Sequence, residues 1–517
     1  MPMLTMKDRI QELREKHLAL HRMGGEDKIA KQHAAGKLTA RERIAELLDV
    51  ESFHELMAYA EHRATLFGMD GRHFPAEAVV TGTGTVEGRG VHIASHDFTV
   101  AGGSAGEVHC DKIVEMMKAA MKTGTPMIVI NDSAGARVQE GIDALAAYGR
   151  IFYYNTLASG VIPQIALICG PCAGGAVYSP ALTDFIIQTK AARMFITGPE
   201  VIKQVTGEDI SQEALGGPDA HMKKSGVIHF VAEDDQDALR ICKRLLSFLP
   251  SNNVEMGHRE PFDEIIELDD ALNTILPEDP KKPYDMRDII KRVVDHADFL
   301  EVQEHFAQNI IIGFARIMGR TVGIIANQPK FMAGCVDINS SDKSARFIRF
   351  CNAFNIPVVT FVDVPGFLPG IHQEHNGIIR HGAKMLFAYS QCTVPKITVI
   401  VRKAYGGSYL AMCGKDLGAD RVAAWPSAEV AVMGAEGAAS IVFRKEIEEA
   451  GDPEARRKEL IEHYRAQFTT PYVAAARRLV DDVIEPAETR LFLAQSLEAL
   501  ASKRETRPAK KHGNIPL

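Results

Sequence analysis

Two pairs of glycine-rich segments contain the residue types in this 517-residue sequence that could do chemistry. They are Asp132-Ser-Ala-Gly-Ala136 and Gly170-Pro-Cys-Ala-Gly-Gly175 in the first half, and Asp363-Val-Pro-Gly-Phe367 and Lys403-Ala-Tyr-Gly-Gly-Ser408 in the second. Each follows an apolar run typical of a buried strand and is predicted to lead into a helix. Glycine allows close approach of the backbone to a ligand, and a helix start presents unpaired N–H groups. Two such turns side by side could form an oxyanion hole, which stabilises an oxygen that gains negative charge.

The two predicted holes are not identical. Pro365 stands where the first half has Ala134, and proline has no N–H to donate. The second turn would therefore donate from Gly366 or Phe367, and the first from Ala134 or Gly135. A purely structural role of these glycines in strand–helix packing stays open for any single turn. That alternative is weaker for a pair of turns that occurs twice at matched spacing.

Other chemistries find little support. Ala173 or Gly174 stands where a strand-to-helix nucleophile would be expected, and Ser408 has no evident base. The pair Cys169 and Cys172 has redox spacing, but a chance spacing of buried thiols is favoured because no second pair could complete a zinc site.

Histidines and the hairpin glycines give no clear site either. The 19 histidines are scattered along the chain and contain no H-E-x-x-H pattern, so no zinc site is predicted from them. His372 and His375 could form a polar cluster after the second-half turn or simply belong to a loop. The glycines of segment 81–90 lie in a β-hairpin pattern, which argues against a dinucleotide fingerprint.

The turns come in pairs because the sequence repeats itself once. The pairs Pro126/Pro357, Asp132/Asp363 and Gly135/Gly366 are 231 residues apart, Pro163/Pro395, Gly174/Gly406 and Gly175/Gly407 are 232 apart, and Asp49/Asp295, Phe53/Phe299 and Glu55/Glu301 are 246 apart. The larger upstream offset predicts an insertion in the first half around residues 62–75. A single core stops growing at about 250–300 residues. Two domains, 1–255 and 256–517, are therefore predicted, with the proline-rich segment 250–283 as their connection.

Both halves have the same predicted order of elements. Helices are expected at 40–48, 107–122, 286–294 and 344–355, β-rich runs at 79–95 and 310–326, and buried strands at 127–131, 164–169, 358–363 and 396–401. Apolar strands that alternate with helices indicate parallel strands covered on both faces. The fold class is therefore α/β with one domain design used twice.

Long motifs resemble the carboxyltransferase β subunits of biotin-dependent acyl-CoA carboxylases, which include propionyl-CoA carboxylase β chains and methylmalonyl-CoA transcarboxylase subunits. The motifs are Gly36-Lys-Leu-Thr-Ala-Arg-Glu-Arg-Ile44, Asp97-Phe-Thr-Val-Ala-Gly-Gly-Ser-Ala-Gly-Glu107, Asp132-Ser-Ala-Gly-Ala-Arg-Val-Gln-Glu-Gly141, Gly170-Pro-Cys-Ala-Gly-Gly-Ala-Val-Tyr178, Asp363-Val-Pro-Gly-Phe367, Arg402-Lys-Ala-Tyr-Gly-Gly-Ser-Tyr-Leu410 and Pro426-Ser-Ala-Glu-Val-Ala-Val-Met-Gly434. The resemblance covers essentially the whole chain. It implies tandem ClpP/crotonase-like domains in a homohexamer, with sites between the first half of one chain and the second half of another.

The resemblance also implies the site chemistry. The first half would hold the acyl-CoA, with Gly174 and Gly175 binding the thioester oxygen, and the second half would hold biotin, with Gly407 and Ser408 binding its ureido oxygen. Carboxybiotin would supply CO₂ and a basic biotin nitrogen that removes the α-proton of the acyl-CoA, and the enolate would attack the CO₂. Biotin would come on a biotin carboxyl carrier, charged by a biotin carboxylase subunit, since the chain shows no ATP-grasp pattern and no biotinyl-lysine motif.

The expected reaction is carboxyl transfer to or from a short-chain acyl-CoA, with propionyl-CoA or methylmalonyl-CoA favoured. The same site run in reverse, in a biotin-dependent sodium-pumping methylmalonyl-CoA decarboxylase, is the alternative, and a non-catalytic scaffold is a weaker one. Leu410 stands where many propionyl-specific members have Asp, so it and Tyr409 are predicted specificity residues, although simple packing of Leu410 stays open. Gly102, Gly103 and Arg137 are candidates for the CoA phosphates, as is Lys112.

Composition sets outer limits on the function. The net charge of −8 leaves no global basic field for nucleic acid, and the basic cluster at 503–511 is expected to be a solvated tail. The N-terminus is charged from the start, so a secretory signal is not expected there, and prolines interrupt the most apolar stretch, 159–182. A cytoplasmic protein without direct membrane insertion and without a metal is predicted.

Overall fold

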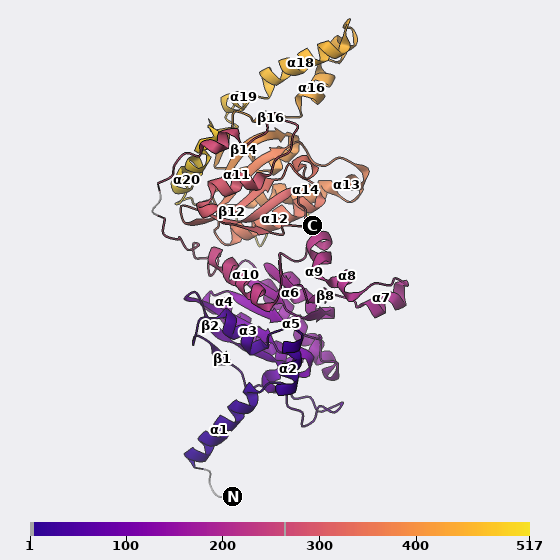
Figure 1. The fold of residues 1–517 in the computed structure, drawn as a ribbon, viewed down its shortest axis with the longest axis vertical. Coiled ribbons are helices and arrows are strands. Elements are labelled where there is room, and N and C mark those ends of the chain that lie inside the picture. The colour runs from indigo at the N-terminus through magenta and orange to yellow at the C-terminus, as the bar shows by residue number, and fades with distance from the viewer. Residues whose placement is uncertain (1–4, 263–264) are drawn as a thin grey trace. The chain divides into compact units, whose positions relative to one another are not determined.

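The computed structural model describes residues 5–262 and 265–517. The chain divides into two compact units, Met1–Glu255 and Met256–Leu517, each built on one large mixed sheet (Figure 1).

The sheet of the first unit has the order β1-β2-β3-β4-β5-β7-β9, with antiparallel pairing up to β3 and parallel pairing from β3 onward. Its strands are β1 His54–Leu56, β2 Val79–Val86, β3 Arg89–His96, β4 Met127–Asn131, β5 Gln164–Ile168, β7 Phe185–Thr189 and β9 Phe230–Ala232; β6 Pro171–Ala173 pairs separately with β8 Arg193–Phe195. The helices are α1 Met6–His21, α2 Glu26–Ala34, α3 Ala40–Leu47, α4 Glu107–Thr123, α5 Ile142–Ala158, α6 Tyr178–Leu182, α7 Pro199–Thr206, α8 Gln212–Gly216, α9 Pro218–Ala220 and α10 Asp235–Phe248.

The sheet of the second unit has the corresponding order β10-β11-β12-β13-β14-β15-β17, with β16 on the end of β14. Its strands are β10 Phe299–Val302, β11 Ile310–Ile317, β12 Arg320–Asn327, β13 Val358–Val364, β14 Lys396–Tyr405, β15 Arg421–Ala424, β16 Glu429–Ala431 and β17 Asp482–Val483. The helices are α11 Met286–Val293, α12 Ile338–Ala353, α13 Ile371–His375, α14 Ile378–Gln391, α15 Gly406–Ala411, α16 Ala435–Val442, α17 Arg444–Glu448, α18 Pro453–Phe468, α19 Pro471–Ala476 and α20 Thr489–Ala499.

The repeat read from the sequence extends to individual strand pairings. The hairpins β2–β3 and β11–β12 have the same length and lie 231 residues apart, and the pair β6–β8 corresponds to the end of β14 with β16. The segment between β1 and β2 is much longer than the one between β10 and β11, and it contains the predicted insertion. The duplicated α/β design is thus confirmed.

The strands bury both faces, as the apolar runs predicted. In the first unit Met127 and Val129 of β4 pack in a cluster with helices α4 and α5. Ile128 and Ile130, which alternate with them, point to the opposite face and are also fully buried. In the second unit the cluster around Trp425 joins strands β11 to β15 with helices α11 and α20.

Two sequence predictions need correction. The helix expected at 344–355 begins six residues earlier as α12, because Asp337 caps it and Ser340 completes a capping box. The segment predicted as a connection does not all link the units, since Leu272 is buried in the second core and the backbone N–H of Asp269 donates to the carbonyl of Ala487. The Pro and polar content misled here because a covering loop has the same composition as a linker.

No helix in the described part of the chain is both long enough and apolar enough to cross a membrane.

A glycine at the same place in both hairpins gives a test of the strand packing. A Cβ on Gly313 would lie 2.4 Å from the carbonyl oxygen of Leu300, and one on Gly82 would lie 2.2 Å from that of His54. We expect Gly313→Ala to lower the free energy of unfolding by about 1–3 kcal/mol, as overpacking does. Gly149→Ala, in helix α5 with no atom within 4 Å of the new Cβ, is the matched control and should not destabilise. Urea unfolding measures both, and equal stability of Gly313→Ala and wild type would contradict the packing argument.

Candidate active site: two glycine openings

The first opening lies where β5 leads through β6 into a short helix. A 3₁₀ turn, Gly174–Val177, follows β6 directly and continues into α6. Gly174 has φ +65°, a left-handed conformation that favours glycine. Gly175 is exposed, and a Cβ built on either glycine would meet no atom within 4 Å. As first residues of a helical turn, they have N–H groups without an intrahelical acceptor.

The second opening repeats this geometry at the end of β14. Gly406, with φ +60°, begins α15 in the position that Gly174 has in the first unit. Gly407 is exposed and again has no atom within 4 Å of an added Cβ. Ser408 is buried, and its hydroxyl donates to the carbonyl of Tyr405 at 2.7 Å, so only its N–H is left for a ligand. The strand runs to Tyr405, so the residues before the glycines are strand and not the turn that the sequence predicted.

Gly175 and Gly407 have similar backbone conformations and similarly open surroundings. Neither is in the left-handed region, and neither is crowded by its own unit. Backbone conformation and packing within the unit therefore give no reason for glycine at these two positions. Both positions therefore leave room for a group from outside the unit to approach the backbone.

The neighbouring first-unit turn does not supply the donors that the sequence suggested. The N–H of Ala134 donates to the carbonyl of Gly102 at 2.9 Å, and the N–H of Gly135 donates to the hydroxyl of Ser133 at 3.1 Å. The turn instead supports β6, because the N–H of Ser133 donates to the carbonyl of Pro171 at 2.9 Å. Ala134 and Gly135 thus position the opening and have no free N–H of their own.

The matching second-unit turn differs in this respect. The carbonyl of Gly366 accepts from the N–H of Val336 at 3.1 Å, but no acceptor among the described residues is within hydrogen-bond reach of the N–H groups of Gly366 and Phe367. A Cβ on Gly366 would be in open space. The Phe367 ring is half-buried and lies against Gly382 of α14. Both residues therefore stay candidates.

A buried carboxylate lies behind each opening, at the end of the central strand. Asp132 accepts from Lys37 Nζ at 2.7 Å and from Arg43 at 2.9 Å, and a Cβ on Gly170 would collide with it. Arg43 is fully buried and also bonds Asp235 of α10 at 2.8 Å, so it joins α3, β4 and α10. This cluster could not be recognised from the sequence pattern, although Lys37 and Arg43 belong to one of the quoted motifs.

In the second unit the carboxylate is Asp363. It accepts from Arg402 Nε at 3.0 Å, from the Tyr284 hydroxyl at 2.9 Å and from the N–H of Lys403 at 3.1 Å. Burial raises the pKa of Asp363, and the Arg402 charge opposes that rise. Arg402 occupies the position of Gly170 in the repeat, so the same task is done by a different part of the chain.

Arg137 and the start of α4, both predicted to bind CoA phosphates, already have partners within the first unit. Arg137 is buried and contacts Glu77 at 2.7 Å and Glu140 at 2.8 Å. The Glu140 carboxylate also accepts from the N–H of Glu107 at 2.6 Å, which fills the start of α4 where a phosphate was expected.

Gly103 and Lys112 also have structural tasks. A Cβ on Gly103 would lie 2.3 Å from the carbonyl oxygen of Asp132, whereas Gly102 offers its carbonyl to Ala134. Lys112 is buried and donates to the carbonyls of Ala76 at 2.7 Å and Val79 at 2.6 Å, and burial lowers its pKa to about 8. Arg137 and Lys112 are thus engaged within the first unit, whereas Gly102 stays a candidate.

The remaining predicted residues separate by exposure. Leu410 is 40% exposed on α15, close in sequence to Gly407, as a substrate-facing residue should be. Tyr409 is buried and packs against Gly414, and burial raises its pKa to about 12, which indicates a structural role. His372 and His375 are exposed on α13. No group of three metal-ligating side chains occurs among the described residues.

The paired cysteines of the first unit are buried thiols. Burial raises the pKa of Cys172 to about 12, and it also raises the pKa of Cys169. Both are free thiols.

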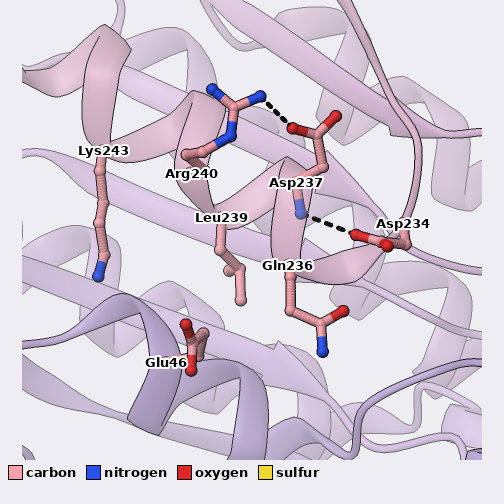
Figure 2. A pocket seen from close by; sticks show the side chains of 7 residues that line it. All are labelled: Glu46, Asp234, Gln236, Asp237, Leu239, Arg240 and Lys243. Atoms are coloured by element: carbon pink, nitrogen blue, oxygen red, sulfur yellow. Dashed lines mark hydrogen bonds and ion pairs between the residues drawn. The ribbon is translucent and has the colours of Figure 1, made fainter.

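A surface hollow elsewhere in the first unit is a separate feature. It lies between the end of α3 and helix α10 (Figure 2). The lining residues are Glu46, Asp234, Gln236, Asp237, Leu239, Arg240 and Lys243. Arg240 pairs with Asp237, and no residue of the glycine turns takes part. Its mixed charges do not indicate a particular ligand.

Two repeated α/β units, each with a glycine opening at a helix start, define a chain of the crotonase-like fold class. Residues 31–515 match the carboxyl transferase domain, and the chain belongs to that family.

Relatives at high identity cover essentially the whole chain. The chain is 61% identical over 512 residues to the methylmalonyl-CoA carboxyltransferase 12S subunit of Propionibacterium freudenreichii subsp. shermanii, which covers 99% of this chain and 98% of the relative. It is 58% identical to the methylmalonyl-CoA decarboxylase subunit alpha of Veillonella parvula, over 100% of both chains. A crystal structure of the transcarboxylase 12S hexamer, with methylmalonyl-coenzyme A and methylmalonic acid bound, matches with a TM-score of 0.98 at 60% identity, over 100% of this chain and 99% of that one.

The buried ion pair behind the first opening provides a stability test. We expect Asp132→Ala to destabilise the protein by about 3–5 kcal/mol, because Arg43 would stay buried with part of its charge uncompensated. Glu448→Ala, which removes an exposed partner of Arg444, should hardly change stability. Denaturant unfolding compares the two variants. Similar midpoints would show that the buried pair does not hold the first unit together.

Proposed function

We propose that this chain transfers a carboxyl group between carboxybiotin on a carrier protein and the α-carbon of a short-chain acyl-CoA. The supporting observation is that Gly175 and Gly407 open onto free space for which neither unit gives a structural reason. Each opening combines an exposed backbone with the N–H groups of a helix start, which suits an oxygen that gains negative charge. The names of the relatives point to the same chemistry.

In this proposal the first unit holds the acyl-CoA. The N–H groups of Gly174 and Gly175 would donate to the thioester oxygen and stabilise the enolate that forms when the α-proton leaves. A donor of this kind contributes about 3–4 kcal/mol to transition-state stabilisation. The turn Ser133–Gly135 would keep the donors in place, since it holds the carbonyl of Pro171 just before them.

The second unit fits the ureido oxygen of biotin. Gly407 leaves room for a ring to approach, and Gly407 and Ser408 can donate two adjacent N–H groups. Gly366 and Phe367 lie in the neighbouring turn, and their N–H groups have no acceptor within the described part of the chain. When bound, carboxybiotin supplies the CO₂ and the base, so the chain itself has to orient, stabilise charge and exclude water.

The proposed assembly is a homohexamer that works with biotin carboxyl carrier and biotin carboxylase subunits. We propose that the first-unit opening of one chain meets the second-unit opening of a neighbouring chain. Methylmalonyl-CoA and propionyl-CoA are the proposed substrates, in keeping with the apolar, exposed Leu410. Subunits of a transcarboxylase, a decarboxylase and a carboxylase are similarly close relatives, which suggests that partner subunits determine the direction of transfer.

The direct test uses the purified chain with malonyl-CoA or methylmalonyl-CoA and free biotin as carboxyl acceptor. We expect the CoA ester to lose its carboxyl group only when biotin is present. Chromatography of the CoA esters measures this loss. Absence of reaction with every carboxyacyl-CoA, in a folded oligomer, would count against the enzyme function and favour a scaffold.

Substitution of the open glycines should separate activity from stability. We expect Gly175→Ala and Gly407→Ala to fold normally, because the added Cβ meets no protein atom, and to lose activity about 10²-fold through obstruction of the bound oxygen. Gly407→Pro should abolish transfer, since it removes the N–H at a helix start where proline is tolerated.

Two glycines with equally open surroundings serve as controls, Gly149→Ala in the first unit and Gly451→Ala in the second. Both should retain activity. A folded Gly407→Pro oligomer with normal transfer to biotin would refute the assignment of the second opening.

A further inference from the structure

Tyr178 is the first exposed side chain beyond the first opening. It follows Gly175 by three residues, and Ala176 and Val177 between them are buried. The residue is 47% exposed. In the repeat its counterpart is Leu410, which follows Gly407 by the same three residues and is 40% exposed.

The ring of Tyr178 is held in place from the protein side. It makes an edge contact with Phe152 of α5, with ring centroids 6.0 Å apart and an interplanar angle of 79°. The next residue, Ser179, donates to the side-chain oxygen of Asn155 at 3.0 Å and ties α6 to α5. One part of the ring is thus supported by α5 and another part is open to solvent.

The usual direction of helical side chains points this ring toward the opening. Side chains of a helix lean toward its N-terminus, so a residue covers the surface of the turn before its own Cα. The turn before Tyr178 is Gly174–Val177, where the space beside both glycines is empty. A large aromatic residue therefore borders the place where a ligand of the first opening would lie.

We propose that Tyr178 limits the size of the acyl group that the first opening accepts. This proposal rests on the proposed function, because it assumes an acyl thioester at Gly174 and Gly175. A group bound there can extend along the helix surface only until it meets the supported ring. One methylene in an apolar pocket changes specificity about 10–200-fold, so a removed ring should change acyl preference measurably.

The test compares methylmalonyl-CoA with ethylmalonyl-CoA, whose acyl branch is longer by one methylene, with free biotin as acceptor. For Tyr178→Ala we expect the kcat/KM ratio of ethylmalonyl-CoA to methylmalonyl-CoA to rise about 10-fold over wild type. Tyr178→Phe keeps the ring and should keep the wild-type ratio. Tyr178→Leu introduces the residue found at the counterpart position in the second unit and should give an intermediate ratio. It replaces the alanine variant in the test if that variant is poorly folded.

Two controls isolate the effect. Tyr153→Ala removes another exposed tyrosine, on α5, and should leave the ratio unchanged. Wild-type activity toward methylmalonyl-CoA separates the two proposals, because its absence would refute the function itself. An unchanged ratio in active Tyr178→Ala and Tyr178→Leu would overturn the role of Tyr178, as would a loss of oligomers without a change in ratio.

Discussion

Each unit depends on one buried carboxylate at the end of its central strand. Asp132 and Asp363 lie where the polypeptide leaves the sheet, next to the strand that carries the open glycines. A carboxylate buried there is costly unless cations and donors compensate it. Lys37 and Arg43 compensate the first, and Arg402 and Tyr284 the second. Strand ends that could splay apart are thereby held in register, and the backbone N–H groups beyond them keep a fixed direction.

The sequence was sufficient for the fold because the relevant signals are local. Apolar runs that end at glycine-rich turns predicted strands β4 and β5 almost to the residue. The aligned prolines, aspartates and glycines predicted the duplication. The same signals were less accurate at the ends of individual elements. Helix α12 began earlier than its apolar pattern because its first turn is stabilised by the Asp337 cap and not by hydrophobic contacts.

The site was predictable in type but not in its partners. Glycine at 174, 175, 406 and 407 could be found because spacing and repetition are visible in one dimension. The occupation of Ala134 and Arg137 could not, since the acceptors Gly102 and Glu77 lie 32 and 60 positions away in the sequence. A buried arginine and a phosphate-binding arginine look alike in a sequence, and only the carboxylates of Glu77 and Glu140 distinguish them.

The different cations behind the two carboxylates have a consequence for the chain ends. Asp363 is compensated from Tyr284 and from its neighbouring strand, all within the second unit. Asp132 relies on Gln32 and Lys37, which precede helix α3 by only a few residues. A shortened chain that begins at α3 would keep every strand of the first unit, yet it would leave this carboxylate without two of its partners. The N-terminal segment is therefore part of the first opening in energetic terms, and the boundary of a minimal domain lies upstream of the sheet it supports.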